Sequence, residues 1–262
     1  MNPNPEDQND FDENAGDSGR KISRALVVLP TYNERENLPL MVDALLKIEP
    51  PLDIVVVDDG SPDGTGEIAS GLAEGNPRVN VIHRAGKLGL GTAYLAGFRF
   101  GLERGYELLI SMDCDFSHNP NYLPEMMAKA EEADLVIGSR YTEGGGTKGW
   151  PLKRRIISRT ANLGMRILLG LRTRDSSAGF RCYRRSALET IGLNTIRSTG
   201  YNALEEMVFR CEKAGLNIAE IPIIFEERRL GQTKMSFNDM LGVALLAIKL
   251  RWEPIARRLR RS

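Results

Sequence analysis

The chain has few cysteines, no net charge and no long hydrophobic run, and each shortage excludes a class of protein. Only 3 of its 262 residues are cysteine, too few for a disulfide framework or a zinc site, which favours a reducing cytoplasm. Lys and Arg together number 35, as do Asp and Glu, so we expect no nucleic-acid partner. The longest uncharged stretch, Leu88 to Phe98, is much shorter than the roughly 20 residues of a membrane-spanning helix.

The two ends of the chain carry opposite charge. Residues 1–21 are acidic and almost without apolar side chains, which predicts a disordered acidic tail and no signal peptide. Residues 239–262 join an apolar run to a basic segment that contains Trp252. This composition suits an amphipathic segment at an anionic membrane surface, and it equally suits a C-terminal helix docked on the core with a solvated basic end. Residues 22–238 are predicted to form one domain.

Short apolar runs alternate with helical patterns through this domain. The predicted strands are residues 25–30, 54–57, 108–112 and 135–138, and the helical patterns between them include residues 34–47, 91–103 and 123–132. Nearly continuous apolar strands are typical of a parallel sheet covered on both faces. The sequence therefore predicts an α/β fold with a Rossmann-like, mostly parallel sheet.

Acidic side chains follow two of these strands at the edge where such sheets bind ligands. Asp113 and Asp115 come directly after a buried strand, and two oxygen ligands at this spacing can share one Mg²⁺ or Mn²⁺ with a diphosphate. Asp58 and Asp59 lie before Gly60. They predict either a simple turn or carboxylates that accept hydrogen bonds from a nucleobase or a ribose, and the residues alone leave this choice open.

An ordered set of motifs covers most of the domain. It consists of residues 29–34, 57–65, 87–91, 113–118, 138–141, 144–146, 150–158, 177–184 and 228–234. In this order the motifs resemble the inverting glycosyltransferases of family 2 and, more narrowly, the dolichol-phosphate (polyprenol-phosphate) mannosyltransferases. The resemblance implies a glycosyltransferase A-type fold, with residues 22–238 as a single catalytic domain.

The resemblance also implies a set of site residues. The nucleoside of the donor would be held by Pro30, Tyr32, Glu34, Val57 and Asp59. The metal and diphosphate site would comprise Asp113, Cys114, Asp115 and Ser117, with Asp113, Asp115 and Ser117 as the metal ligands. The basic residues on the phosphates would be Arg140, Arg154, Arg228 and Lys234, and the catalytic set would be Asp113, Asp115, Arg140 and Arg228.

Two of these positions depart from the family. Cys114 stands where the family commonly has Ala, and Ser117 stands where many members have Gln. Because a Ser side chain is shorter than Gln, a bridging water could replace it as a ligand. Neither change removes a carboxylate from the predicted metal site.

The implied reaction is the transfer of mannose from GDP-mannose to a polyprenyl or dolichyl monophosphate, with inversion and with Mg²⁺ or Mn²⁺ as cofactor. A phosphate monoester, whose second pKa is about 6, needs no carboxylate base to become a nucleophile. It needs cations, which the basic cluster of residues 148–155 and the pair Arg228 and Lys234 could supply. We expect the enzyme to lie peripherally at the cytoplasmic face of a membrane, with a separate membrane subunit as a further candidate partner.

Three alternatives remain open at this point. A related transferase could move glucose from UDP-glucose to the same lipid class. A nucleotidyltransferase also uses paired aspartates on a Rossmann-like sheet. A non-catalytic sugar-nucleotide-binding subunit would be expected to have lost some of the acids, all of which are present here.

Overall fold

The computed structural model describes residues 24–200 and 202–227. The predicted acidic tail, the segment 239–262, Arg228 and Lys234 lie outside the described residues. Their predicted roles, and the limits of the domain at residues 22 and 238, therefore stay predictions.

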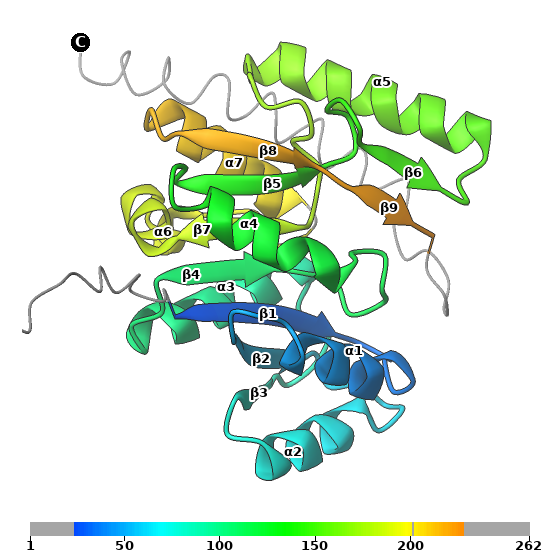
Figure 1. Ribbon diagram of the computed structural model, residues 1–262, viewed down its shortest axis with the longest axis vertical. Helices are drawn as coiled ribbons and strands as arrows, with labels where there is room; N and C mark the ends of the chain where they lie inside the picture. The colour runs from blue at the N-terminus through cyan, green and yellow to red at the C-terminus, as the bar shows by residue number, and fades with distance from the viewer. Residues whose placement is uncertain (1–23, 201, 228–262) are drawn as a thin grey trace, which may run out of the picture.

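A seven-stranded sheet in the order β3-β2-β1-β4-β7-β5-β8 forms the centre of the fold (Figure 1). The pairs β1–β2, β1–β4, β2–β3 and β5–β8 are parallel, and β7 is antiparallel to both β4 and β5. A second, two-stranded sheet pairs β6 with β9. The strands are β1 (Ala25–Thr31), β2 (Asp53–Asp58), β3 (Val79–His83), β4 (Leu108–Ser111), β5 (Leu135–Ser139), β6 (Gly146–Lys148), β7 (Arg181–Arg184), β8 (Ile218–Pro222) and β9 (Ile224–Glu226).

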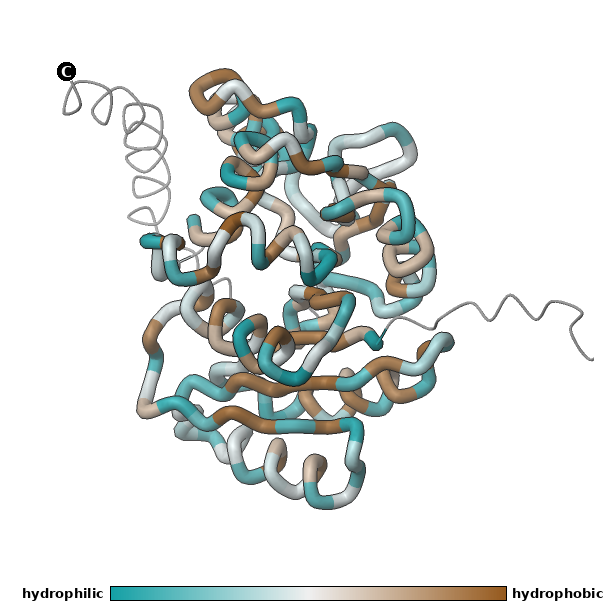
Figure 2. Tube along the Cα trace, turned by 90° about the vertical axis from the view of Figure 1, so that its left-hand side faces the viewer, coloured by the Kyte–Doolittle hydropathy of each residue, from teal (hydrophilic) through white to brown (hydrophobic). Residues whose placement is uncertain are grey.

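Helices cover both faces of the large sheet. They are α1 (Asn37–Leu46), α2 (Thr65–Gly75), α3 (Leu90–Glu103), α4 (Leu123–Lys129), α5 (Leu152–Leu169), α6 (Arg185–Ile191) and α7 (Asn202–Lys213), with two short 3₁₀ helices at Pro120–Tyr122 and Leu193–Thr195. One core packs α1, α2 and α4 against the sheet, and the other packs α3, α6 and α7. In Figure 2 the brown, hydrophobic stretches gather in the central strands between these helices.

The alternation of side chains along β1 explains why both faces are covered. Val27 and Leu29 belong to one core and Leu26 and Val28 to the other, and all four are fully buried. Gly97 lets α3 approach this strand closely, because a Cβ atom there would lie 2.3 Å from a methyl group of Val28. The predicted Rossmann-like, mostly parallel sheet is therefore confirmed, and β7 is its antiparallel member.

Helix α5 stands apart from both layers. It packs through Met165 and Leu169 on a small cluster with Leu171 and with Phe209 of α7. In Figure 1 it forms the outermost element at the end of the molecule opposite α2. Within the described ranges, no helix combines the length and the apolar character that crossing a bilayer requires.

Candidate active site

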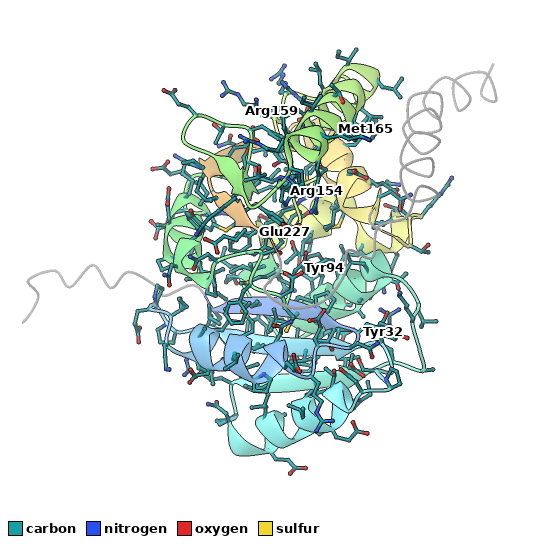
Figure 3. All side chains as sticks on the ribbon, turned by 90° about the vertical axis from the view of Figure 1, so that its right-hand side faces the viewer. Tyr32, Tyr94, Arg154, Arg159, Met165 and Glu227 are labelled. Atoms are coloured by element: carbon teal, nitrogen blue, oxygen red, sulfur yellow. The ribbon has the colours of Figure 1, made fainter. Side chains whose placement is uncertain are left out.

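The strand order brings three predicted site segments to one edge of the sheet. Because β2, β1 and β4 are parallel neighbours, the loops after Thr31, Asp58 and Ser111 leave the sheet on the same side. Figure 3 looks onto this edge, toward which the arrowheads of β1 and β5 point in Figure 1. Tyr32 is seen here in the lower half of the molecule, Tyr94 near the middle, and Arg154 and Arg159 in the upper half.

Hydroxyl groups hold the first carboxylate of this edge. Asp58 is buried and accepts hydrogen bonds from the hydroxyls of Thr31 at 3.0 Å and Ser61 at 2.5 Å. The Ser61 hydroxyl also accepts the backbone N–H of Asn33, which has the left-handed φ of 58°. This network ties the loop after β1 to the loop after β2, so Asp58 is mainly a structural group.

Asp59 faces the loop that precedes α3. Its carboxylate lies 3.0 Å from the Arg84 guanidinium and accepts the backbone N–H of Leu88 at 3.2 Å. Burial raises the pKa of Asp59, and Arg84 opposes this shift. The motif of residues 87–91 is thereby brought next to Asp59. Lys87 of this motif also lies over the Tyr32 ring, with its Nζ 4.8 Å from the ring centroid.

The loop between β1 and α1 presents the next predicted donor residue, Glu34. The backbone N–H of Glu34 donates to the Thr65 hydroxyl, and its carboxylate accepts the Asn37 side-chain amide at 2.8 Å. Thr65 opens α2, while Asn37 opens α1. Glu34 is therefore positioned by the first residues of two helices, and it is half-buried rather than enclosed.

The predicted metal-binding pair follows β4. The Tyr94 hydroxyl donates to Oδ1 of Asp113 at 2.8 Å. Asp115 is buried, and its Oδ1 accepts both the backbone N–H of Ser117 at 3.0 Å and the Ser117 hydroxyl at 2.6 Å. Ser117 thus orients the Asp115 carboxylate. Whether it also binds a metal directly stays a prediction.

His118 stabilises this loop from within. It is buried, its Nδ1 accepts the backbone N–H of Asp113 at 3.1 Å, and its ring stacks on Phe180 with centroids 5.1 Å apart. Gly179 packs against it, since a Cβ atom there would lie 3.2 Å from the His118 ring. On its other side the ring meets Phe225 of β9 edge-on at 5.5 Å. The structure therefore supports a turn-stabilising role for His118.

Arg140, directly after β5, is held by a carboxylate that lies 35 positions later in the chain. Its Nε and Nη2 donate to the two oxygens of Asp175 at 2.8 and 2.7 Å, and Nη2 also donates to the Ser177 hydroxyl at 2.8 Å. Although burial alone would raise the pKa of Asp175, Arg140 holds that pKa below its ordinary value. Asp175 raises the pKa of Arg140 against the opposing effect of burial. The pair is therefore ionised.

The segment 175–179 connects Arg140 to the predicted metal-binding pair, Asp113 and Asp115. Ser177 contacts Arg140, and the carbonyl of Gly179 accepts the Ser111 hydroxyl of β4 at 2.7 Å. An added Cβ at Gly179 would be 4.0 Å from Oδ1 of Asp113. Phe225 makes a second connection, because its ring contacts His118 and lies 5.7 Å from the Arg140 guanidinium. The segment 175–179 and Phe225 thus link the acids that follow β4 to the arginine that follows β5.

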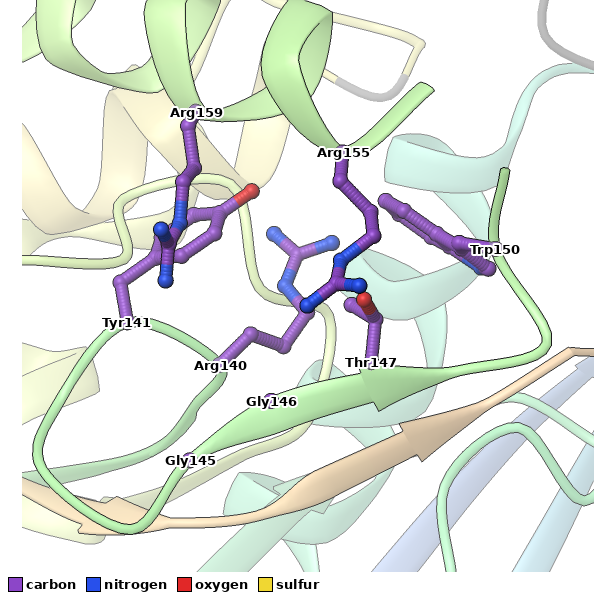
Figure 4. A pocket seen from close by; sticks show the side chains of 8 residues that line it. All are labelled: Arg140, Tyr141, Gly145, Gly146, Thr147, Trp150, Arg155 and Arg159. Carbon is purple, nitrogen blue, oxygen red and sulfur yellow. The ribbon is translucent and has the colours of Figure 1, made fainter. Parts of the chain in front are cut away.

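A basic pocket opens beside Arg140 (Figure 4). Arg155 and Arg159 reach into it from α5, toward the guanidinium of Arg140. Trp150 forms one wall, and its buried indole N–H has no hydrogen-bond partner among the described residues. The lining residues are Arg140, Tyr141, Gly145, Gly146, Thr147, Trp150, Arg155 and Arg159. Three guanidinium groups around one cavity fit an anionic ligand with several oxygens, such as a phosphate.

The other predicted residues lie at varied depths. Pro30 is near the end of β1 and half-buried, whereas the side chains of Val57 and Cys114 belong to the hydrophobic core. Arg154 lies over the Trp150 ring at 4.0 Å and pairs with Glu227 at 2.9 Å, at the rim of the basic pocket. Their assignments to the donor site stay predictions.

Sequence reasoning missed three residues of this region. Asp175 anchors Arg140, Arg159 lines the basic pocket, and Glu205 is a buried acid in the first turn of α7. The pKa of Glu205 is raised to about 7, chiefly by burial and also by Asp175, against the opposing effects of Arg181 and Arg140. Asp175 directly precedes the motif of residues 177–184, which is a signal that could have marked it. No local pattern marks Glu205.

The architecture is that of the A-type glycosyltransferases. A crystal structure of glucosyl-3-phosphoglycerate synthase from Mycobacterium tuberculosis, with Mn²⁺, UDP-glucose and phosphoglyceric acid, is similar to the chain with a TM-score of 0.61. The match covers 88% of this chain and 79% of that one at 19% identity, so it bears on the fold alone. The chain belongs to glycosyl transferase family 2, whose sequence model matches residues 26–192.

Two curated relatives are much more similar in sequence. An undecaprenyl-phosphate mannosyltransferase of Micrococcus luteus is 47% identical over 241 residues, which is 90% of this chain and 99% of the relative. A polyprenol monophosphomannose synthase of Mycolicibacterium smegmatis is 50% identical over 223 residues, which is 84% of each chain. The family expected from the ordered motifs is therefore confirmed.

Proposed function

We propose that the chain transfers mannose from GDP-mannose to a polyprenyl monophosphate, with inversion at the anomeric carbon. The observation that carries the proposal is the pairing of two unlike sites through the segment 175–179. Gly179 of this segment packs near Asp113, and Ser177 accepts a hydrogen bond from Arg140, which lines the basic pocket with Arg155 and Arg159. The names of the two curated relatives, a polyprenyl-phosphate mannosyltransferase and a polyprenol monophosphomannose synthase, support the same sugar and acceptor class.

The residues after β4 fit a divalent metal. Asp113 and Asp115 offer hard oxygen ligands, and Tyr94 and Ser117 orient them by hydrogen bonds to one oxygen of each. Within the described ranges, no three His, Cys, Asp or Glu side chains gather as a metal site. Two carboxylates, Asp113 and Asp115, are a ligand number that Mg²⁺ and Mn²⁺ sites use when water and substrate phosphates fill the other positions. A metal bound there would neutralise charge on the leaving diphosphate.

The side chains around the site would bind and orient the donor and the acceptor. Asp59, Glu34 and Tyr32 border the donor side, and Arg155 and Arg159 would hold the acceptor phosphate with Arg140. An acceptor phosphate oxygen forms the new bond to C1 of mannose while the bond from C1 to the diphosphate breaks, and GDP leaves with the electron pair. Since the phosphate is already mostly dianionic near pH 7, no carboxylate need remove a proton.

A lipid acceptor implies that the enzyme works at a membrane surface. We propose peripheral association at the cytoplasmic face, where GDP-mannose would be supplied. The apolar and basic segment 239–262 remains a predicted contributor, and a separate membrane subunit remains a candidate partner. No nucleic acid is expected to bind.

The reaction can be tested by following donor radiolabel into organic solvent in the presence of Mg²⁺ or Mn²⁺. We expect label from GDP-mannose to partition with polyprenyl phosphate and not with the matching polyprenol, which lacks the phosphate. Faster transfer from UDP-glucose would instead identify a glucosyltransferase. Release of pyrophosphate from GTP and mannose 1-phosphate would identify a nucleotidyltransferase.

A further inference from the structure

Helix α5 has an unusual distribution of charge and apolar side chains. Its 18 residues include no Asp or Glu, and the basic ones are Lys153, Arg154, Arg155, Arg159 and Arg166. It also carries six of the large hydrophobic side chains that are exposed in the described part of the chain, namely Leu152, Ile156, Ile157, Leu163, Ile167 and Leu168. A helix both basic and outwardly apolar is typical of the membrane interface.

The apolar side chains of α5 point away from the protein. The face that contacts the rest of the molecule contains Asn162, Met165 and Leu169. Spacings of three, four and seven residues share a helix face, so Ile156, Leu163 and Ile167 form a stripe on nearly the opposite side. Their exposed fractions are 54%, 50% and 73%. This is the reverse of an ordinary surface helix, which buries its apolar stripe.

Arginines lie between the apolar stripe and the body of the protein. By the same helical spacing, Arg155, Arg159 and Arg166 share one flank of α5, and two of them, Arg155 and Arg159, reach into the basic pocket (Figure 4). The basic pocket therefore lies along the arginine-bearing flank of α5, which adjoins the apolar stripe. A phosphate bound in the pocket would contact the arginine guanidinium groups, and the apolar stripe beside it would face outward.

We propose that α5 is a membrane-docking helix, which lays Leu152, Ile156, Leu163 and Ile167 into the interface of an anionic bilayer. The inference builds on the proposed function, because docking in this orientation would bring the basic pocket to the lipid phosphates. Charge complementarity selects the anionic bilayer as the occupant, since a second copy of α5 would oppose five cations to five. Lys and Arg near an anionic surface each strengthen such binding.

The decisive experiment is flotation of the full chain with vesicles, comparing Ile156→Gln/Ile167→Gln with the unmodified protein. Vesicles of phosphatidylglycerol and phosphatidylcholine serve as the anionic probe, and vesicles of phosphatidylcholine alone serve as the neutral one. We expect the double variant to bind anionic vesicles at least about tenfold more weakly, because two exposed apolar side chains lose their burial in the interface. Leu40→Gln on α1 is the matched control, since Leu40 is 61% exposed and should leave binding unchanged.

Activity separates this inference from the proposed function. With a short, water-soluble prenyl phosphate as acceptor, the double variant should transfer mannose at the unmodified rate. With a long polyprenyl phosphate in vesicles it should be slower. Failure of the unmodified protein to transfer mannose to either acceptor would count against the proposed function, while flotation would still test the helix.

Three results would overturn the docking role of α5. The double variant could float as well as the unmodified protein. Binding could be abolished by deleting residues 239–262 and be insensitive to the α5 changes. The unmodified protein could sediment as a dimer that the double variant dissociates, with vesicle binding unchanged, in which case the apolar stripe is a contact between copies.

Discussion

The two sides of the site hold their charged groups in opposite ways. On the β1–β2–β4 side, the carboxylates of Asp58, Asp113 and Asp115 are oriented by the hydroxyls of neutral residues, and Asp59, which pairs with Arg84, is the exception. On the β5 side, Arg140 is bound through two nitrogens to a buried carboxylate. Hydroxyl donors leave the negative charge in place, whereas a carboxylate cancels the charge of the arginine it binds.

This difference indicates where the positive charge of the basic pocket comes from. Because Asp175 neutralises Arg140, the net charge must come from Arg155 and Arg159, for which no ion pair with another described residue is found. Arg140 is then a fixed donor of hydrogen bonds, and the α5 arginines are the charges. In the proposed function, the negative charge of Asp113 and Asp115 serves to bind a metal, and the positive charge of Arg155 and Arg159 serves to bind a phosphate.

The largest effect is expected from neutralising the acidic side. Asp115→Asn should lower the mannosyl transfer rate by on the order of 10³-fold or more, because the leaving diphosphate loses the cation that stabilises its charge. The measurement is the turnover rate at saturating GDP-mannose over a range of Mn²⁺ concentrations. Full activity of this variant would contradict the metal assignment.

Ser117→Ala sharpens the same measurement. If Ser117 only orients Asp115, this variant should need roughly 10-fold to 100-fold more Mn²⁺ for half-maximal activity, as is usual when a partner of a metal ligand is removed. Its turnover rate at saturating Mn²⁺ should stay close to that of the unmodified enzyme.

The next largest effect concerns the buried pair on the basic side. Asp175→Asn leaves the guanidinium of Arg140 buried without its counter-charge, and should lower the free energy of unfolding by about 3 kcal/mol or more. Urea denaturation at pH 7 measures this change. Glu227→Gln is the matched comparison, because it breaks the exposed pair with Arg154 and should change stability by no more than about 1 kcal/mol. Equal effects of the two variants would show that burial does not distinguish the pairs.

A smaller effect is expected from Glu205, the buried acid on α7 near Arg181. Its pKa is about 7 in the folded protein against an ordinary value of 4.5, so the folded state keeps a proton that the unfolded chain loses between these values. The contribution of Glu205 to stability is therefore full below about pH 4.5 and falls as the pH rises to about 7.

Glu205→Gln should remove this loss. Relative to the unmodified protein, the variant should gain on the order of 2–3 kcal/mol in free energy of unfolding between pH 5 and pH 8. Urea denaturation of both proteins across this pH range separates the contribution of Glu205 to the free energy of unfolding from that of other titrating groups. A constant difference between the two curves would mean that Glu205 ionises at its ordinary pH.

The smallest effect concerns a single charge on α5. Arg159→Gln should raise the KM for a short prenyl phosphate by about 10-fold, since a charged hydrogen bond to phosphate contributes roughly 1.5 kcal/mol. Lys153→Gln makes the same change in net charge outside the basic pocket and should leave this KM nearly unchanged. Equal effects would indicate that overall charge, rather than contact, draws the acceptor.

Much of the fold could be predicted from the sequence. The runs at residues 25–30, 54–57, 108–112 and 135–138 became strands, because continuous apolar segments must be covered on both faces. The position of Asp113 and Asp115 directly after a buried strand was also predictable, and their role as metal ligands stays a prediction. Residues 181–184 could not be placed in advance, since an antiparallel strand between β4 and β5 depends on partners far away in the sequence.

The sequence by itself determined the alternation of strands and helices, the edge of the sheet that carries the acids, and the family. These follow from local sequence patterns and from the order of the motifs along the chain. Only the tertiary structure decided that Asp175 neutralises Arg140, that Glu205 is buried, and that α5 turns its apolar stripe outward. Each of these depends on contacts between residues that are far apart in the sequence, and local sequence patterns do not determine such contacts.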